Sequence, residues 1–160
     1  MVEVAYDRAA AAEYAETWAL KRNPAYMDFE HSGGDCTNFA SQCIYAGSRE
    51  LNFTPLYGWF YITASNRTPS WTGVEFLRNF LVSNKGLGPY AQELPEEAAQ
   101  PGDIVQLGNA QRFYHSPVVV KVENGQIYIA AHSVDVWMRP LSDYSYQRSR
   151  CLHILGVRKP

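Results

Sequence analysis

The chain contains few cysteines, little excess charge and no long apolar run. Its 160 residues include three cysteines, too few for a fold that depends on disulfides. The formal net charge is −2 and 19% of residues are charged, so no polybasic stripe is present to bind nucleic acid or anionic membranes. No segment approaches the roughly 18 apolar residues of a membrane span. The composition therefore predicts a protein that neither binds nucleic acid nor inserts into a membrane. We also expect it to be a monomer.

The N-terminal residues 1–7 lack the positive start and the apolar stretch of a signal peptide. We therefore expect either an intracellular protein or a domain taken from a longer exported chain, which would act outside the cell or in its envelope. A length of 160 residues with 46% hydrophobic content is typical of one domain. The expected domain spans residues 1–160.

Hydrophobic periodicity predicts helices in the first half of the chain and strands in the second. The expected helices cover residues 6–22, 35–46 and 72–82, and residues 84–90 are expected to form a loop. The expected strands cover residues 104–107, 118–123, 126–131, 136–139 and 152–157. Helices followed by antiparallel strands are typical of an α+β domain, with the helices packed on a C-terminal antiparallel sheet.

Cys36 stands at the predicted start of the second helix, in the run Gly33-Gly34-Asp35-Cys36. The N-terminus of a helix carries partial positive charge, which favours a thiolate and binds a developing oxyanion. Cys43 is seven residues further on, about 10 Å along the helix axis, too far for a disulfide or a shared zinc ion. Cys36 is therefore the candidate nucleophile, whereas Cys43 and Cys151 are expected to be buried apolar residues.

Asn124-Gly125 predicts a tight hairpin turn between the strands at 118–123 and 126–131. Counting outward from this turn places Val118 opposite Ala131 and brings His115 and His132 to one face at the open end of the hairpin. Asp135 then points to the other face. A one-residue bulge near Pro117 would reverse that assignment.

A cysteine nucleophile needs a base within hydrogen-bond reach, and histidine is the usual one. We expect His115 to be this base and His132 to accept a hydrogen bond from the Nδ1–H of His115, which fixes its tautomer. Asp135 is the alternative third member. His31, just before Cys36, is expected to line the cleft. Trp59 is a candidate for a substrate groove, although packing in the core is the alternative for an aromatic residue.

The segment Gly33-Gly34-Asp35-Cys36-Thr37-Asn38-Phe39-Ala40-Ser41-Gln42 resembles the putative amidase domain family. Tyr6-Asp7-Arg8 near the N-terminus, and His132-Ser133 before Arg139-Pro140-Leu141, are also similar to that family. The order of Cys36, His115 and His132 resembles the papain-like cysteine hydrolases of the NlpC/P60 and CHAP superfamily.

The resemblance implies a cysteine nucleophile, a histidine base and hydrolysis of an amide bond through a thioester, with bacterial cell-wall peptides as expected substrates. No metal or organic cofactor is implied. The family pattern leaves the third member open between His132 and Asp135. Glu30 stands six residues before Cys36, where papain has its oxyanion-hole glutamine. A carboxylate does not stabilise an oxyanion, so the backbone N–H of Cys36 remains the expected donor.

Three rival functions use the same residues. A catalytically silent domain would keep the fold and bind cell-wall or other peptides. A transamidase would pass the acyl group from Cys36 to an amine in place of water. A metal hydrolase would use the two hairpin histidines as ligands.

Overall fold

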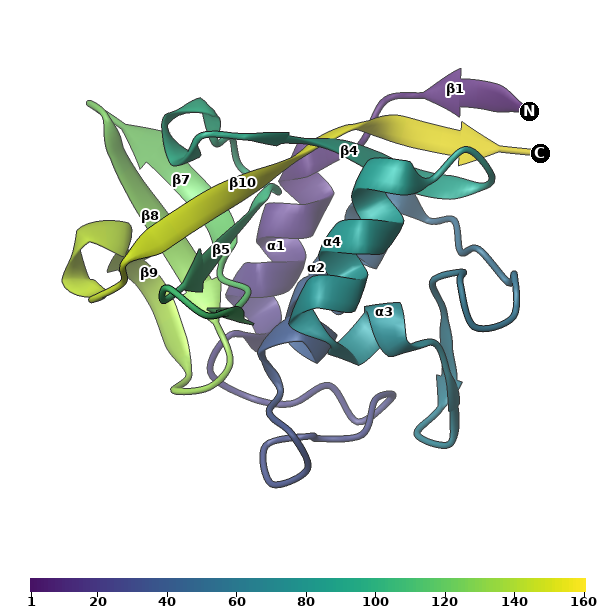
Figure 1. Cartoon of the computed structure of the whole chain (residues 1–160), viewed down its shortest axis with the longest axis horizontal. Coiled ribbons are helices and arrows are strands. Elements are labelled where there is room, and N and C mark those ends of the chain that lie inside the picture. Colours follow the sequence, from purple (N-terminus) through teal and green to yellow (C-terminus); the bar gives the residue numbers. More distant parts are fainter.

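In a computed structural model, which describes residues 1–160, helices pack against one face of a curled antiparallel sheet (Figure 1). The helices are α1 (Arg8–Trp18), α2 (Cys36–Ser48), α3 (Pro69–Thr72) and α4 (Val74–Ser83), and two single 3-10 turns are η1 (Glu96–Ala98) and η2 (Leu141–Asp143). The strands are β1 (Val2–Val4), β2 (Tyr61–Thr63), β3 (Asn66–Arg67), β4 (Gly88–Leu94), β5 (Ile104–Gly108), β6 (Phe113–His115), β7 (Val118–Glu123), β8 (Gln126–Ala131), β9 (Val136–Pro140) and β10 (Arg148–Lys159). The predicted α+β class is confirmed.

The main sheet has the strand order β1-β10-β5-β7-β8-β9, with β4 added to β10 and β6 added to β5. Strands β2 and β3 form a separate hairpin. The long strand β10 pairs with β1, so Val4 lies opposite Val157 and the two chain ends lie side by side (Figure 1). Five predicted strands are present, and β1, β4, β6 and the β2–β3 hairpin are additions that the sequence pattern did not predict.

The predicted loop at 84–90 is wrong in its second half, because β4 begins at Gly88. Gly88 has a φ of 99°, which favours glycine, and Pro89 follows it. Both residues are typical of loops. Proline is typical of edge strands, and β4 pairs with β10 on one side only.

Helix α2 lies in the core and is buried along most of its length. Phe39, Ala40, Cys43 and Ile44 contact the first core, as their helical spacing predicts. The helix runs past Gly47, the predicted stop, to Ser48, and a glycine is needed at position 47 for close packing. A Cβ at Gly47 would lie 2.6 Å from the Asp7 carbonyl oxygen.

Two hydrophobic cores lie on opposite faces of the sheet. The first core lies between the helices and the sheet, and its strand residues include Ile104, Val118 and Leu152. The second core lies on the other face, where Leu107 and Cys151 belong to it. The strands between them are therefore apolar on both faces. Because successive side chains point to opposite faces, neighbouring residues of one strand join different cores.

The β7–β8 hairpin contains a bulge. Its turn has the predicted register, with Glu123 opposite Gln126. The register then shifts at Val120, so that Val119 lies opposite Ile129, where the regular pattern predicted Val120. A bulge of one residue moves every side chain beyond it to the other face.

The bulge changes the pairs at the open end of the hairpin. Val118 lies opposite Ala130, so its predicted pairing with Ala131 is wrong. Val118 and Ala130 both join the first core, whereas Val119 and Ala131 join the second. His115, four residues before Val119, therefore no longer shares a face with His132, two residues after Ala130.

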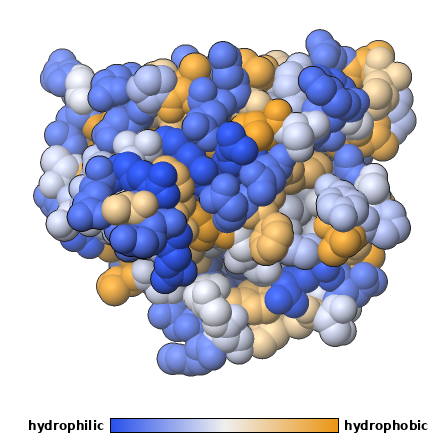
Figure 2. All heavy atoms as spheres, viewed as in Figure 1, coloured by the Kyte–Doolittle hydropathy of each residue, from blue (hydrophilic) through white to orange (hydrophobic).

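The face shown in Figure 2 is mostly hydrophilic, with apolar residues in small separate groups. None of the helices combines the length and the apolar character needed to span a membrane.

Candidate active site

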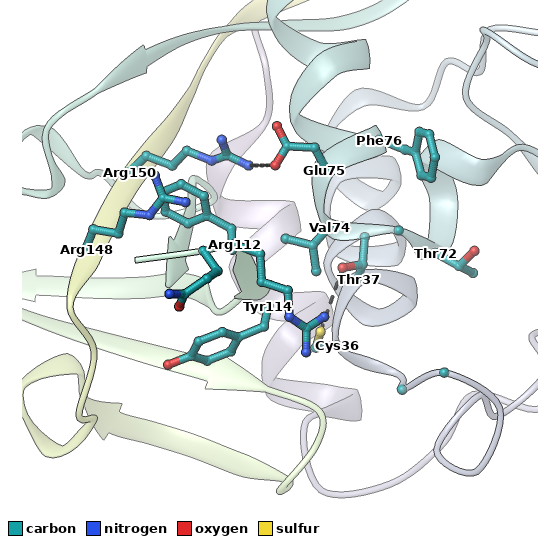
Figure 3. A pocket seen from close by; sticks show the side chains of 15 residues that line it. Cys36, Thr37, Thr72, Val74, Glu75, Phe76, Arg112, Tyr114, Arg148 and Arg150 are labelled. Carbon is teal, nitrogen blue, oxygen red and sulfur yellow. Dashed lines mark hydrogen bonds and ion pairs between the residues drawn. The ribbon is translucent and has the colours of Figure 1, made fainter. Parts of the chain in front are cut away.

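A cavity of about 660 Å³ opens at the N-terminus of α2, between that helix, α4 and the strands β6 and β10 (Figure 3). Cys36 and Thr37 line it from α2, Glu75 from α4, Tyr114 from β6 and Arg150 from β10. Its volume is in the range of small-ligand sites. Of the three cysteines, Cys36 lines this cavity, and Cys43 and Cys151 do not.

Cys36 is the first residue of α2, yet burial raises the pKa of its thiol above the ordinary value, and the negative charge of Asp35 raises it further. The Thr37 hydroxyl, 3.7 Å from Sγ, and the backbone N–H groups of Ser116 and Thr37 lower the pKa without reversing this effect. The prediction of a lowered thiol pKa is therefore wrong for this conformation. Desolvation of the thiolate outweighs the helix N-terminus.

The ring of His115 points away from Cys36. Its strand partner Leu107 belongs to the second core, on the sheet face opposite the helices. Ser116, the next residue, faces the helices, and its hydroxyl lies 3.0 Å from the Thr37 hydroxyl. The strand therefore brings Ser116 to Cys36, and the structure contains no hydrogen bond between Cys36 Sγ and His115.

His115 packs against Tyr144, with 5.6 Å between ring centroids. Burial, with a smaller contribution from the positive charge of Arg139, lowers the pKa of His115 from 6.5 to about 4. His115 is therefore neutral at pH 7 and has a free lone pair.

The lowered pKa of His115 predicts a loss of stability in acid. Between pH 6.5 and pH 4 the unfolded chain binds a proton at this residue and the folded chain does not, so stability falls as pH falls, by about 3 kcal/mol over the range. We expect His115→Gln to lose less stability than the wild type between pH 7 and pH 4.5 in urea unfolding. His31→Gln, at an exposed position, is the matched control. Equal losses in all three proteins would contradict the prediction.

His132 is buried beside the start of α2 and binds Asp35, not His115. Its Nδ1 lies 2.6 Å from Asp35 Oδ2, and its Nε2 lies 2.9 Å from the Trp18 carbonyl oxygen. The Asp35 carboxylate also accepts hydrogen bonds from the Phe29 N–H at 2.8 Å and from Asn38 Nδ2 at 2.9 Å. The predicted contact between His132 and His115 is therefore wrong, and both ring nitrogens of His132 have other partners.

Asp135, the alternative third member, binds Arg22 through both carboxylate oxygens, at 2.7 and 3.0 Å. Glu30 binds the same guanidinium at 3.2 Å and also accepts a hydrogen bond from Ser133. Neither Asp135 nor Glu30 lines the cavity. Both acidic residues that the sequence placed near the site, Asp135 and Glu30, therefore bind Arg22 outside the cavity.

Two predicted cleft residues lie elsewhere. Trp59 is fully buried in the first core, where its ring is tilted against Trp71 with 4.7 Å between centroids, and it donates a hydrogen bond to the Ser41 hydroxyl at 3.1 Å. The prediction of a substrate groove at Trp59 is wrong, because its indole has both an apolar environment and a buried acceptor. His31 is exposed in the loop before α2 and does not line the cavity.

Comparison with known proteins assigns the chain to a family. The family described as "Putative amidase domain" matches residues 5–155. The chain belongs to this family. It is also 34% identical over 139 residues to "Uncharacterized protein YhbB" from Bacillus subtilis (strain 168), an alignment that covers 84% of this chain and 43% of that protein. The chain thus spans less than half the length of this relative. No solved structure matches the chain.

Within this amidase family domain, sequence patterns did not identify three residues near Cys36. Thr37 lines the cavity and lies 3.7 Å from Sγ, the buried Ser116 lies behind it, and Arg112 points into the cavity toward Cys36 (Figure 3). Thr37 could have been found, because the residue after a helix-start cysteine lies in the first turn. The other two depend on the bulge and on a loop conformation that no local pattern encodes.

The arrangement places a thiol, backbone N–H donors and a cationic wall around one cavity. The first N–H groups of α2 have no intrahelical acceptor, so they can bind an oxyanion formed beside Cys36. No group of three or more His, Cys, Asp or Glu side chains is placed to hold a metal ion. The two hairpin histidines lie on opposite faces of the sheet and do not converge as a ligand pair.

Proposed function

We propose that this domain hydrolyses an amide bond with Cys36 as the nucleophile and a thioester as the intermediate. The observation that carries the proposal is the position of the thiol. Cys36 lies at the first residue of α2 and at an open cavity, whereas Cys43 and Cys151 are fully buried. Membership of the family described as "Putative amidase domain" supports the same reaction.

In the proposed reaction, Cys36 loses its proton to a base and Sγ bonds to the carbonyl carbon of the substrate. Collapse of the tetrahedral intermediate breaks the C–N bond, and the amine leaves with a proton from the base. Water then attacks the thioester and releases the acid. The N–H groups at the start of α2 stabilise the oxyanion in both steps.

His115 is the proposed base, although its ring lies on the other face of the sheet. A one-residue change in the pairing of β6 with β5 would bring the ring to the face of Cys36. Strand β6 pairs with β5 at two residue pairs only, and the register is irregular between them. Few backbone hydrogen bonds would therefore be lost in such a change. Because His115 is neutral, its ring can accept the thiol proton after the ring has moved to the face of Cys36.

His132 is proposed to act through Asp35. The hydrogen bond between them holds the residue that precedes Cys36 and so helps to fix the start of α2. Asp135 has a similar indirect role through Arg22.

We further propose that the substrates are bacterial cell-wall peptides and that the domain is related to the papain-like NlpC/P60 and CHAP hydrolases. A cysteine at a helix N-terminus followed by an antiparallel sheet supports this relationship.

Incubation with purified muropeptides and with synthetic peptides tests the proposal. We expect new carboxyl and amino ends in the products by mass spectrometry. Acid quenching during turnover should leave a mass increment equal to the acyl fragment on the Cys36 peptide. Cleavage without such an adduct, in single-turnover samples, would contradict the cysteine mechanism. Transfer of the acyl group to an added amine in preference to water would identify a transamidase.

A catalytically silent peptide-binding domain is the second candidate. The raised pKa of the Cys36 thiol and the orientation of His115 favour it, because a binding domain needs neither a thiolate nor a base. It predicts retention of peptides without cleavage, and a Cys36→Ala variant that binds them as well as the wild type.

A further inference from the structure

The cavity over Cys36 is lined by three arginines and one glutamate, whereas the whole chain has a formal net charge of −2. Its other lining residues are uncharged. The cavity is therefore locally positive in a protein that is negative overall. Such a cavity raises the local concentration of anions and disfavours cations.

Two of the arginines are fixed by contacts on the cavity wall. Arg150 donates to Gln106 Oε1 at 2.9 Å and to Glu75 Oε2 at 2.8 Å, so Glu75 neutralises it. Arg148 donates to the Asn109 carbonyl oxygen at 2.7 Å. Both guanidinium groups also lie over the Phe113 ring, at 4.4 Å for Arg148 and 3.8 Å for Arg150. These contacts fix the positions of both guanidinium groups, and they leave four N–H donors of Arg148 and three of Arg150 unused.

Arg112 is different, because its guanidinium has no ion pair, hydrogen bond or aromatic partner in the protein. Its backbone is held, since its N–H donates to Asn109 Oδ1 at 3.0 Å and its carbonyl accepts from the Asn109 N–H at 3.0 Å. A fixed turn thus carries a free guanidinium that points into the cavity toward Cys36 (Figure 3).

We propose that Arg112 binds a carboxylate of the substrate next to the scissile amide, so that the domain acts on acidic peptides. A guanidinium binds a carboxylate through two parallel hydrogen bonds, which orients the ligand as well as attracting it. The inference rests on the proposed role of Cys36, because the carboxylate is placed relative to the bond that Cys36 attacks. It makes Arg112 a specificity-determining residue.

Alkylation of Cys36 tests the charge of the cavity without requiring catalysis. Iodoacetate and iodoacetamide form the same C–S bond and release iodide, but only iodoacetate carries a carboxylate. We would measure both rates on the Cys36 peptide by mass spectrometry in the wild type, Arg112→Gln and Arg78→Gln. Arg78 is an arginine outside the cavity that pairs with Glu93, and its variant is the charge-matched control.

We expect the ratio of the iodoacetate rate to the iodoacetamide rate to fall roughly tenfold in Arg112→Gln and to stay unchanged in Arg78→Gln. The difference should shrink at about 1 M salt, where charges are screened over roughly 3 Å. The same ratio in wild type and Arg112→Gln, or no labelling of Cys36 by either reagent, would overturn the proposal.

A second measurement separates this proposal from the proposed function. Two peptides that differ only by Glu or Gln beside the scissile amide are compared for kcat/KM. We expect Arg112→Gln to lose roughly 10- to 100-fold on the Glu peptide and little on the Gln peptide. Equal rates on both peptides in the wild type would overturn carboxylate recognition while leaving amide hydrolysis intact. Cleavage of neither peptide, with a charge-dependent alkylation ratio, would overturn the proposed amide hydrolysis and leave Arg112 as an anion-binding residue of the cavity.

Discussion

Replacing Cys36 by alanine is expected to reduce amide hydrolysis by roughly 10⁴-fold or more. Loss of the nucleophile from a comparable serine hydrolase costs about 10⁶-fold in kcat, because the remaining site offers only binding and oxyanion stabilisation. In this domain the residual site would be the N–H groups of α2 and the cavity wall. The measurement is product formation from a cleaved muropeptide or peptide, followed over time by mass spectrometry.

Cys43→Ala is the matched control for this variant. Cys43 lies on the same helix but is fully buried in the first core, so its replacement should lower stability modestly and leave kcat nearly unchanged. Unchanged turnover in Cys36→Ala, with native circular dichroism in both variants, would rule out Cys36 as the nucleophile.

Replacing Asp35 by alanine is expected to destabilise the fold by about 3–5 kcal/mol. The Asp35 carboxylate is fully buried, and it binds His132 at 2.6 Å and lies 3.4 Å from Arg22 Nε. It also accepts from the Phe29 N–H and from the Asn38 amide. Removing it leaves all four groups without this partner in a site that water does not reach. Urea unfolding followed by tryptophan fluorescence measures the effect.

Asp28→Ala provides the control, because Asp28 pairs with the same Arg22 Nε at 3.2 Å but is about half exposed. Exposed ion pairs contribute about 1 kcal/mol or less. A loss in Asp35→Ala no larger than that in Asp28→Ala would show that the buried network does not hold the start of α2. Asp35→Asn, which keeps the shape and one acceptor oxygen, should lie between the two variants.

Local patterns in the sequence predicted the elements well, and the positions of the side chains less well. The Cys36 helix and the strands at 118–123 and 126–131 follow from helical and alternating apolar spacing. Strand β6 has three residues and β1 has three, too short for either pattern to stand out. These strands are defined by their pairing with β5 and β10, which are distant from them in the sequence or separated from them by a loop.

The predicted sheet face of His115 came from counting residues outward from the hairpin turn, and one bulge in β7 reverses that face. The count is correct from the Asn124-Gly125 turn as far as Lys121. Val120 then adds one residue, and nothing in the Val-Val-Val run marks which of the three bulges out. Because both faces of β7 are apolar, the sequence gives no signal for the change of face.

The role of Asp35 could not be read from its position either. An aspartate before a helix is a usual N-cap, but the Asp35 side chain makes no capping hydrogen bond to α2. It turns toward His132, which is 97 residues away in the sequence. Trp59 shows the same limit: whether an indole lies in a groove or in the core depends on a distant acceptor, here Ser41.

The pairing of β1 with β10 has a consequence for engineering. Val2 lies directly opposite Lys159, so a linker of a few residues could join the present ends without crossing the molecule. New ends could then be opened at the exposed Asn124-Gly125 turn, which lies far along the chain from Cys36. A circular permutant of this kind would keep every strand of the main sheet and would place the new ends in an exposed turn.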